Sequence, residues 1–243
     1  MNLIKNILDF ILPRECVVCF SILRDSQKDF ICDDCFNKIE IVQYPYCKVC
    51  GRPFISKETL AYSPEHLCFQ CREKRFHFNS ARAAGVYSGI LKELIHIYKF
   101  QKKRALGKLL SEIMIAHLNN RFERIDFDTI IPVPLHKKRL RVRGFDQSLL
   151  LGINIGKQIG VPVLADNLTR YRHTKPQLEL KVNERFKNVR DAFRVIGKEK
   201  IKDKNILLID DVFTTGATVN ECARILKKEG ARKVDVFVLS MTC

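Results

Sequence analysis

N-I-L-L-I-D-D-V-F-T-T-G-A-T, residues Asn205–Thr218, is the segment that decides the fold of this chain. An apolar run ends in two adjacent carboxylates, and a helical pattern begins after a short loop of small residues. We expect a buried strand here that leads through the loop into a helix N-terminus. The unpaired N–H groups and the dipole of such a terminus favour a phosphate, and glycine lets the backbone approach the anion closely.

Two carboxylates beside a phosphate site would repel the ligand unless the ligand also carries sugar hydroxyls or a divalent cation. A phosphorylated sugar satisfies both conditions, because carboxylates accept hydrogen bonds from hydroxyls. The alternative is an ordinary strand–turn–helix unit with a solvated acidic corner. A Walker phosphate loop is excluded, since the sequence contains no G-x-x-x-x-G-K-[ST] pattern.

The same segment resembles the phosphoribosyl-pyrophosphate (PRPP) motif of type I phosphoribosyltransferases. By that resemblance the catalytic residues are Asp210 and Asp211, which face the ribose hydroxyls. The resemblance assigns the 5-phosphate of PRPP to Thr214, Thr215, Gly216, Ala217 and Thr218.

Apolar periodicity elsewhere predicts alternating strands and helices. We expect strands over residues 81–87, 127–133, 161–164, 206–209 and 233–240, and helices over residues 90–99, 104–122, 146–159 and 218–229. This alternation predicts an α/β fold, a mostly parallel sheet with helices on both faces. Ligands of such sheets bind outside the carboxyl ends of the strands, so the loop after Val133 and the acid pair should border one crevice.

Two basic segments follow strands of this sheet. Pro134–Gln147 reads P-L-H-K-K-R-L-R-V-R-G-F-D-Q, and its cations would stabilise a pyrophosphate leaving group; the candidates are His136, Lys137, Lys138 and Arg139. Such a run is also common on a solvated face or a nucleic-acid patch. The second segment is polar and interrupted by proline, which predicts a mobile flap with Arg172, Thr174, Lys175 and Gln177. An ordinary surface loop stays open as the alternative.

Composition limits the class of protein. The 243 residues are 46% apolar, which fits one or two globular domains. The first 80 residues carry 11 Lys or Arg against 10 Asp or Glu, so nearly all of the +16 charge falls on the part with the phosphate loop. No apolar run reaches the ~18 residues of a membrane span. Residues 1–13 predict an amphipathic helix docked on the core rather than on a membrane, and the absence of a cleavage site predicts a cytoplasmic location.

Eight cysteines form four C-x-x-C pairs within the first 71 residues. Two such pairs complete a tetrahedral thiolate site, so four pairs predict two structural zinc sites. The metal ligands are Cys16, Cys19, Cys32, Cys35, Cys47, Cys50, Cys68 and Cys71. We expect sequential pairing, the first two pairs in one site and the last two in the other, although interleaved pairing stays open. Cys222 lies on an apolar helix face and is expected in the core.

Other uses of these cysteines are weaker. A disulfide framework requires an oxidising compartment, which the missing signal peptide argues against. A redox C-x-x-C explains one pair and not four, and an iron–sulfur cluster remains a further alternative. His66, two residues before Cys68, is a rival ligand in the sequence, but Cys68 already fills the position.

Taken together, these segments resemble the ComF family, the competence-protein-F phosphoribosyltransferase-like proteins. The shared motifs include L-P-R-E-C-V-V-C, C-x-V-C-G-R-P, L-I-H-I-Y-K-F, T-K-P-Q and R-F-K-N-V-R-D-A-F, and Asp146 stands where family members commonly carry Asn. The resemblance implies a double zinc-ribbon domain over residues 1–80 and a phosphoribosyltransferase-like domain over residues 81–243. It also implies PRPP with Mg²⁺, a role in natural transformation, and single-stranded DNA and DNA-uptake proteins such as a helicase as partners.

Two functions remain open at this point. The first is a phosphoribosyltransferase of unknown acceptor, since no segment is recognisable as a nucleobase site. The second is a non-catalytic accessory protein that senses PRPP or a nucleotide, or holds DNA, and docks partners through its zinc module. A transcriptional regulator is a weaker third reading, because no helix-turn-helix pattern is visible.

Overall fold

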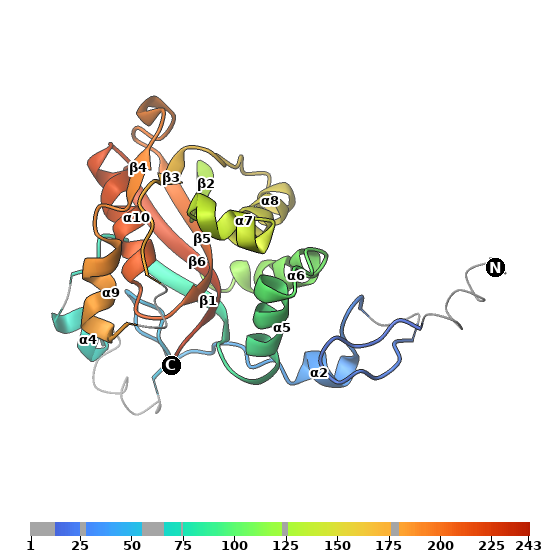
Figure 1. Cartoon of the computed structure of the whole chain (residues 1–243). Helices are drawn as coiled ribbons and strands as arrows, with labels where there is room; N and C mark the ends of the chain where they lie inside the picture. The colour runs from blue at the N-terminus through green and yellow to red at the C-terminus, as the bar shows by residue number, and fades with distance from the viewer. Residues whose placement is uncertain (1–12, 25–27, 55–65, 74, 123–125, 176–179) are drawn as a thin grey trace.

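The core of the protein is a four-stranded parallel sheet with strand order β1-β6-β5-β2 (Figure 1). The computed structural model describes residues 13–24, 28–54, 66–73, 75–122, 126–175 and 180–243. The strands are β1 (Ser80–Val86), β2 (Thr129–Pro132), β5 (Asn205–Phe213) and β6 (Lys233–Met241). Because all four run parallel, the segments after β2 and β5 leave the same edge of the sheet. The expected parallel α/β fold is confirmed.

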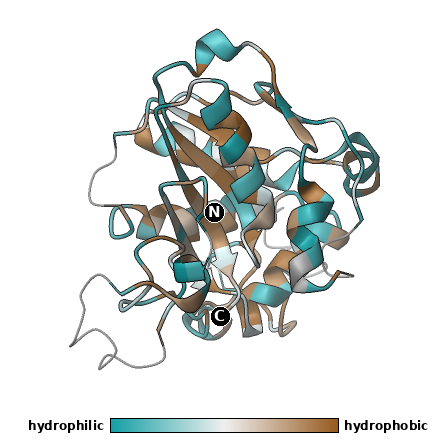
Figure 2. Ribbon diagram, turned by 90° about the vertical axis from the view of Figure 1, so that its left-hand side faces the viewer, coloured by the Kyte–Doolittle hydropathy of each residue, from teal (hydrophilic) through white to brown (hydrophobic). Residues whose placement is uncertain are grey.

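Helices cover both faces of the sheet, as the apolar runs of its central strands require. One face packs against α5 (Gly89–Phe100), α6 (Leu106–Leu118) and α8 (Gln147–Ile159). The other packs against α10 (Ala217–Lys228), whose outer side contacts α9 (Val182–Val189). Figure 2 shows the strands as a hydrophobic layer, with the hydrophilic residues of the helices turned outward. Cys222 is fully buried in the second layer, as expected.

Helix α8 begins and ends at residues whose type suits a helix cap. Asp146 caps its N-terminus, since one carboxylate oxygen accepts from the Leu149 N–H at 3.1 Å and the other from the Leu135 N–H at 3.0 Å. Both partners are donors, which gives a physical reason for Asp rather than Asn at this position: both carboxylate oxygens can accept. Gly160 ends the helix in the left-handed conformation, with φ of 72°.

Three sequence expectations change in the structure. Helix α6 ends at Leu118 rather than at residue 122. The strand expected over residues 161–164 is a single bridge from Val163 to Ile130. The basic segment after β2 is not a plain loop, because it contains the helix α7 (Lys137–Arg143). Five of its seven residues are Lys or Arg, and Leu140 and Val142 alone give no apolar face from which a helix could be predicted.

The segment expected to be a flap contains regular structure. It begins with β3 (Leu168–Arg170), which pairs antiparallel with β4 (Phe193–Val195). Helix α9 lies between the two strands, and a 3-10 turn, η2 (Lys198–Lys200), follows β4. The two short strands form a separate sheet next to α10. Mobility of this segment stays a prediction.

The cysteine-rich segment packs directly on the sheet. It contains α2 (Asp33–Asn37) and α4 (Phe69–Glu73), which lie on opposite sides of the sheet in Figure 1. Its backbone bonds to β1: Val42 N–H donates to Ala84 at 3.1 Å, and Ala81 N–H donates to Val49 at 2.7 Å. The division at residue 80 stays a prediction. The expected N-terminal helix lies outside the described residues, and the helices of the described part are too short or too polar to cross a membrane.

Candidate functional site

The acid pair lies at the edge of the sheet where β5 extends past its neighbour β2. Strand β2 ends with Pro132 opposite Ile209, while β5 continues beside β6 as far as Phe213. The part of β5 that carries Asp210 and Asp211 is therefore paired with β6 on one side and has no paired strand on the other side in the described residues. A cavity of about 460 Å³ lies at this open side, and both Asp210 and Asp211 line it.

The two acids have different partners. Ser148 Oγ on α8 donates to Asp210 Oδ1 at 2.9 Å, and burial, followed by the neighbouring Asp211 charge, raises the pKa of Asp210 to about 7. Asp211 is 7% exposed and accepts from Lys99 Nζ on α5 at 2.8 Å. Such burial is tolerated because the charge is paired. The site thus holds one carboxylate paired with a lysine, Asp211, and one whose pKa is raised, Asp210.

The phosphate loop after β5 has the expected turn into a helix. Gly216 has φ of 77° and precedes the first residue of α10, and a Cβ at this position would lie 2.6 Å from the Phe213 ring. Only glycine fits there without strain. Thr214 and Thr218 line the cavity, whereas the side chains of their neighbours Thr215 and Ala217 are buried in the protein. The loop and the start of α10 thus present a helix N-terminus beside the cavity, and binding of a phosphate there stays a prediction.

The basic helix α7 borders the same cavity, but only part of the predicted cation set faces it. Lys138 and Arg139 line the cavity, while Lys137 is exposed outside it. His136 caps α7, since its Nδ1 accepts from the Lys138 N–H at 3.2 Å. Burial, and then the cationic neighbours, lower the pKa of His136, which favours the neutral ring that this cap requires. His136 therefore shapes the site rather than supplying charge.

The predicted flap residues hold the segment after β3 in place. Thr174 is buried, and it accepts from two arginines: Arg139 donates to its carbonyl oxygen at 3.2 Å and Arg170 to its hydroxyl. Arg172 donates to the carbonyl of Asn188 at 3.0 Å. The carbonyl of Lys175 accepts from the Asn188 side chain at 3.0 Å. Gln177 lies outside the described residues.

Several cavity residues were not assigned to the site from the sequence. These residues lie on elements that are distant in sequence and that the fold brings together around the cavity. They are Lys99, Ser148, Arg143, Arg170, His173, Tyr87, Phe100 and Val142. Arg170 is 8% exposed and Phe100 is 58% exposed. The Arg143 guanidinium lies 5.6 Å from the Phe100 ring centroid. Lys99 lies at the C-terminal end of α5, where no local sequence pattern marked it as a site residue.

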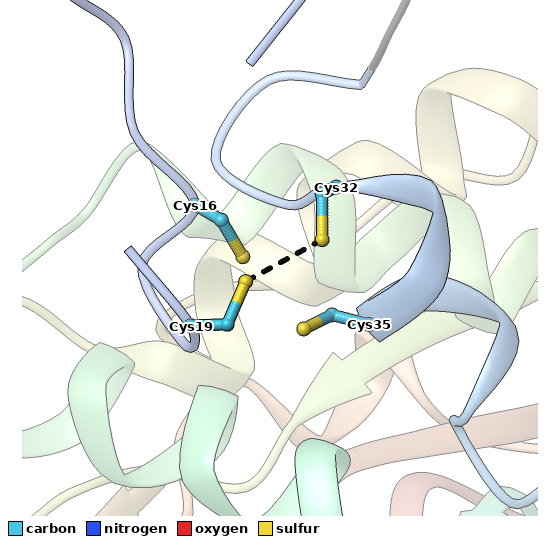
Figure 3. Close-up of side chains that lie close together, drawn as sticks. All are labelled: Cys16, Cys19, Cys32 and Cys35. Atoms are coloured by element: carbon cyan, nitrogen blue, oxygen red, sulfur yellow. Dashed lines mark hydrogen bonds between the residues drawn. The ribbon is translucent and has the colours of Figure 1, made fainter. Parts of the chain in front are cut away.

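The eight predicted ligands form two clusters, with the sequential pairing. Cys16, Cys19, Cys32 and Cys35 form the first, which we call cluster 1, and Cys47, Cys50, Cys68 and Cys71 form cluster 2. Within each cluster the sulfur atoms lie within 4.8 Å of one another. Figure 3 shows the four side chains of cluster 1 pointing toward a common centre. Interleaved pairing is therefore wrong.

The sulfur separations fit zinc. Cys19 and Cys32 are 3.6 Å apart, and Cys50 and Cys68 are 3.5 Å apart. Tetrahedral zinc with Zn–S bonds of ~2.3 Å places sulfurs about 3.8 Å apart, whereas a disulfide requires about 2.05 Å. All ten cysteines are free. Ser21, 3.2 Å from Cys19 Sγ, lowers the pKa of Cys19 to about 6, which favours the thiolate ligand.

Fold and site together define a class: a phosphoribosyltransferase-type α/β protein that carries two Cys₄ sites. The double zinc ribbon domain family matches residues 7–72, and the phosphoribosyl transferase domain family matches residues 151–240.

Relatives cover almost the whole chain. Competence protein F of Haemophilus influenzae is 29% identical over 93% of this chain and 96% of its own length. The DNA utilization protein YhgH of Escherichia coli K12 is 28% identical over 87% and 97%, and competence protein ComFC of Bacillus subtilis is 26% identical over 90% and 86%. Over most of its length the chain is therefore similar to proteins named competence protein F, ComFC and YhgH.

Proposed function

We propose that this protein binds PRPP with Mg²⁺ in the 460 Å³ cavity and acts there as a phosphoribosyltransferase in the handling of incoming DNA. The observation that carries the proposal is that one cavity joins the acid pair, the phosphate loop and the basic helix α7. These three features match the ribose, the 5-phosphate and the pyrophosphate of one ligand. The names of the relatives, competence protein and DNA utilization protein, support the wider role.

The acids would hold the ribose in two ways. Asp211, held in place by Lys99, accepts from a ribose hydroxyl. Asp210 loses its proton near neutral pH and accepts from the other hydroxyl. As the C1–O bond breaks, positive charge develops on the ribose, and two nearby carboxylates favour that charge.

The pyrophosphate would leave toward α7. Lys138 and Arg139 line that part of the cavity, and Arg170 lies buried beneath it. Mg²⁺ would be held by oxygens of PRPP and water, and would neutralise part of the pyrophosphate charge. The chain itself supplies position and charge rather than a covalent intermediate.

The acceptor would lie against the apolar wall of the cavity. Tyr87, Phe100 and Val142 form this wall, which the sequence had not revealed as an acceptor site. An exposed aromatic ring beside an arginine is a suitable surface for a base of single-stranded DNA. Tyr98 and Phe78, two aromatics that lie near basic residues in the sequence, are buried in the core and do not offer such a surface.

Calorimetry with Mg²⁺–PRPP tests the proposal. We expect micromolar binding by the unaltered protein and a loss of about 100-fold or more in Asp210→Asn/Asp211→Asn, because two ribose acceptors are lost. The matched control is Asp33→Asn/Asp34→Asn, an exposed adjacent acid pair on α2 with the same change of charge. Equal binding by both double variants would refute the site. Pyrophosphate release with single-stranded DNA or nucleobases as acceptors then tests the enzyme.

A non-catalytic accessory function is the second candidate, favoured by the exposed side chains of Phe100 and Val142 and the Arg143 guanidinium beside the Phe100 ring. In that case PRPP or a nucleotide would act as a signal, and the zinc module would dock a partner such as a helicase. Binding of Mg²⁺–PRPP without release of pyrophosphate supports this candidate. If DNA binding depends on Lys137, Lys138 and Arg139 but not on the acid pair, the basic helix acts as a DNA scaffold alone.

A further inference from the structure

We infer that Arg52, two residues after the cluster 2 ligand Cys50, is a positioning residue for the phosphate loop. The inference rests on the proposed function and gives the zinc module a role in phosphate binding. Arg52 Nη2 donates to the carbonyl oxygen of Thr214 at 3.2 Å, across 162 residues of sequence. Thr214 is the first residue of the phosphate loop and lines the cavity.

The Thr214 carbonyl has a second donor on the same side. Thr242, just after β6, donates its hydroxyl to this oxygen at 3.2 Å, and its N–H donates to Phe213 at 3.0 Å. Two hydrogen bonds thus fix the direction of one peptide group. A charged donor makes the stronger of the two, because hydrogen bonds to ionised groups exceed neutral ones.

The direction of this carbonyl determines the direction of the next amide. A trans peptide is planar, so the N–H of Thr215 points opposite to the carbonyl oxygen of Thr214. Holding the oxygen toward Arg52 and Thr242 turns the Thr215 N–H away from them. The same bond polarises the peptide and makes the N–H a better donor. Arg52 therefore presets an amide of the loop for the phosphate without contacting the ligand.

Cluster 2 in turn fixes Arg52. Its backbone closes the metal knuckle, since Cys47 N–H donates to the Arg52 carbonyl at 2.8 Å and Gly51 N–H donates to Cys47 at 2.8 Å. The knuckle is seated on the sheet, because a Cβ on Gly51 would lie 2.3 Å from the Ala81 carbonyl oxygen. Zinc in cluster 2 would hold the turn from which Arg52 reaches the loop. Through Arg52, the metal site would therefore affect the affinity of the loop for phosphate.

The test uses Arg52→Met with Arg82→Met as the matched control. Arg82 bonds the same knuckle through the Lys48 carbonyl at 2.8 Å and does not contact the loop in the described residues. Calorimetry with ribose 5-phosphate should show about tenfold weaker binding for Arg52→Met alone, the size of one charged hydrogen bond. Inorganic pyrophosphate should bind all three proteins equally. Zinc content should stay at two per chain in both variants.

Two further measurements separate positioning from general damage. Arg52→Lys keeps a charged donor and should recover part of the affinity for ribose 5-phosphate. Hydrogen exchange should be faster for the amides of residues 214–218 in Arg52→Met than in Arg82→Met. If ribose 5-phosphate binds Arg52→Met as it binds the unaltered protein, the inference fails while the proposed function stands. If the unaltered protein binds neither PRPP nor ribose 5-phosphate, both fail.

Discussion

The two cysteine clusters share one chemistry and differ in what they support. Cluster 1 belongs to the core layer of α5, α6 and α8, and its Cys19 is exposed. Cluster 2 belongs to the layer of α10, and its least buried cysteine, Cys68, is half-buried. Arg52, which lies between the two cysteine pairs of cluster 2, also bonds to the phosphate loop. Equal ligand sets therefore need not have equal functions, because each takes its role from the layer on which it packs.

Loss of a ligand in cluster 2 should have the largest effect. We expect Cys47→Ser to lower the free energy of unfolding by at least about 3 kcal/mol, since structural zinc contributes folding energy and Cys47 is fully buried. Cys19→Ser, at the exposed edge of cluster 1, should cost less. Thermal unfolding and zinc content measure the difference. A greater loss from Cys19→Ser would reverse the comparison.

The contact between the cluster 2 knuckle and β1 comes next. Gly51→Ala should cost about 2–4 kcal/mol, because φ is 71° and the new Cβ would meet the Ala81 carbonyl. Gly89→Ala is the matched control, with φ of 43° and open space around the Cβ, and should cost only about 1 kcal/mol. Urea unfolding of both variants checks the difference, and similar midpoints would show that the knuckle is not seated tightly.

The acids of the site give a prediction that depends on pH. The raised pKa of Asp210 means that between about pH 4 and pH 7 the folded state holds a proton that the unfolded state has lost, so stability falls as pH rises through this range. Asp210→Asn removes this fall and should gain about 1–2 kcal/mol at pH 8. Asp211→Asn should lose stability instead, because it leaves Lys99 unpaired. Melting curves at pH 5 and pH 8 distinguish the two signs; equal shifts would contradict the assigned environments.

The smallest expected effect concerns the second donor to the loop. Thr242→Val removes one neutral hydrogen bond to the Thr214 carbonyl and should weaken ribose 5-phosphate binding about threefold, less than Arg52→Met. Isothermal calorimetry on the two variants gives the order. If Thr242→Val weakens the binding of ribose 5-phosphate more than Arg52→Met does, then Thr242, after β6, positions the loop rather than cluster 2.

Much of the site could be predicted because its signals are local. The apolar run before Asp210, the glycine at the turn and the C-x-x-C spacing each reflect contacts within a few residues. Helix α7 was missed because its exposed basic residues give no periodic apolar face. Lys99 and Ser148 were missed for another reason: they reach the acids from helices far away in sequence, and no local pattern marks the end of a helix that faces a site.

The sequence by itself determined the parallel α/β fold, the eight cysteine ligands and the loop with its acid pair, because strand burial, thiolate spacing and turn geometry are set by neighbouring residues. Only the tertiary structure decided which carboxylate is paired, which cations of Pro134–Gln147 enter the cavity, and that Arg52 reaches the phosphate loop. These depend on strand order and helix packing, which bring residues together across as many as 162 positions of the chain.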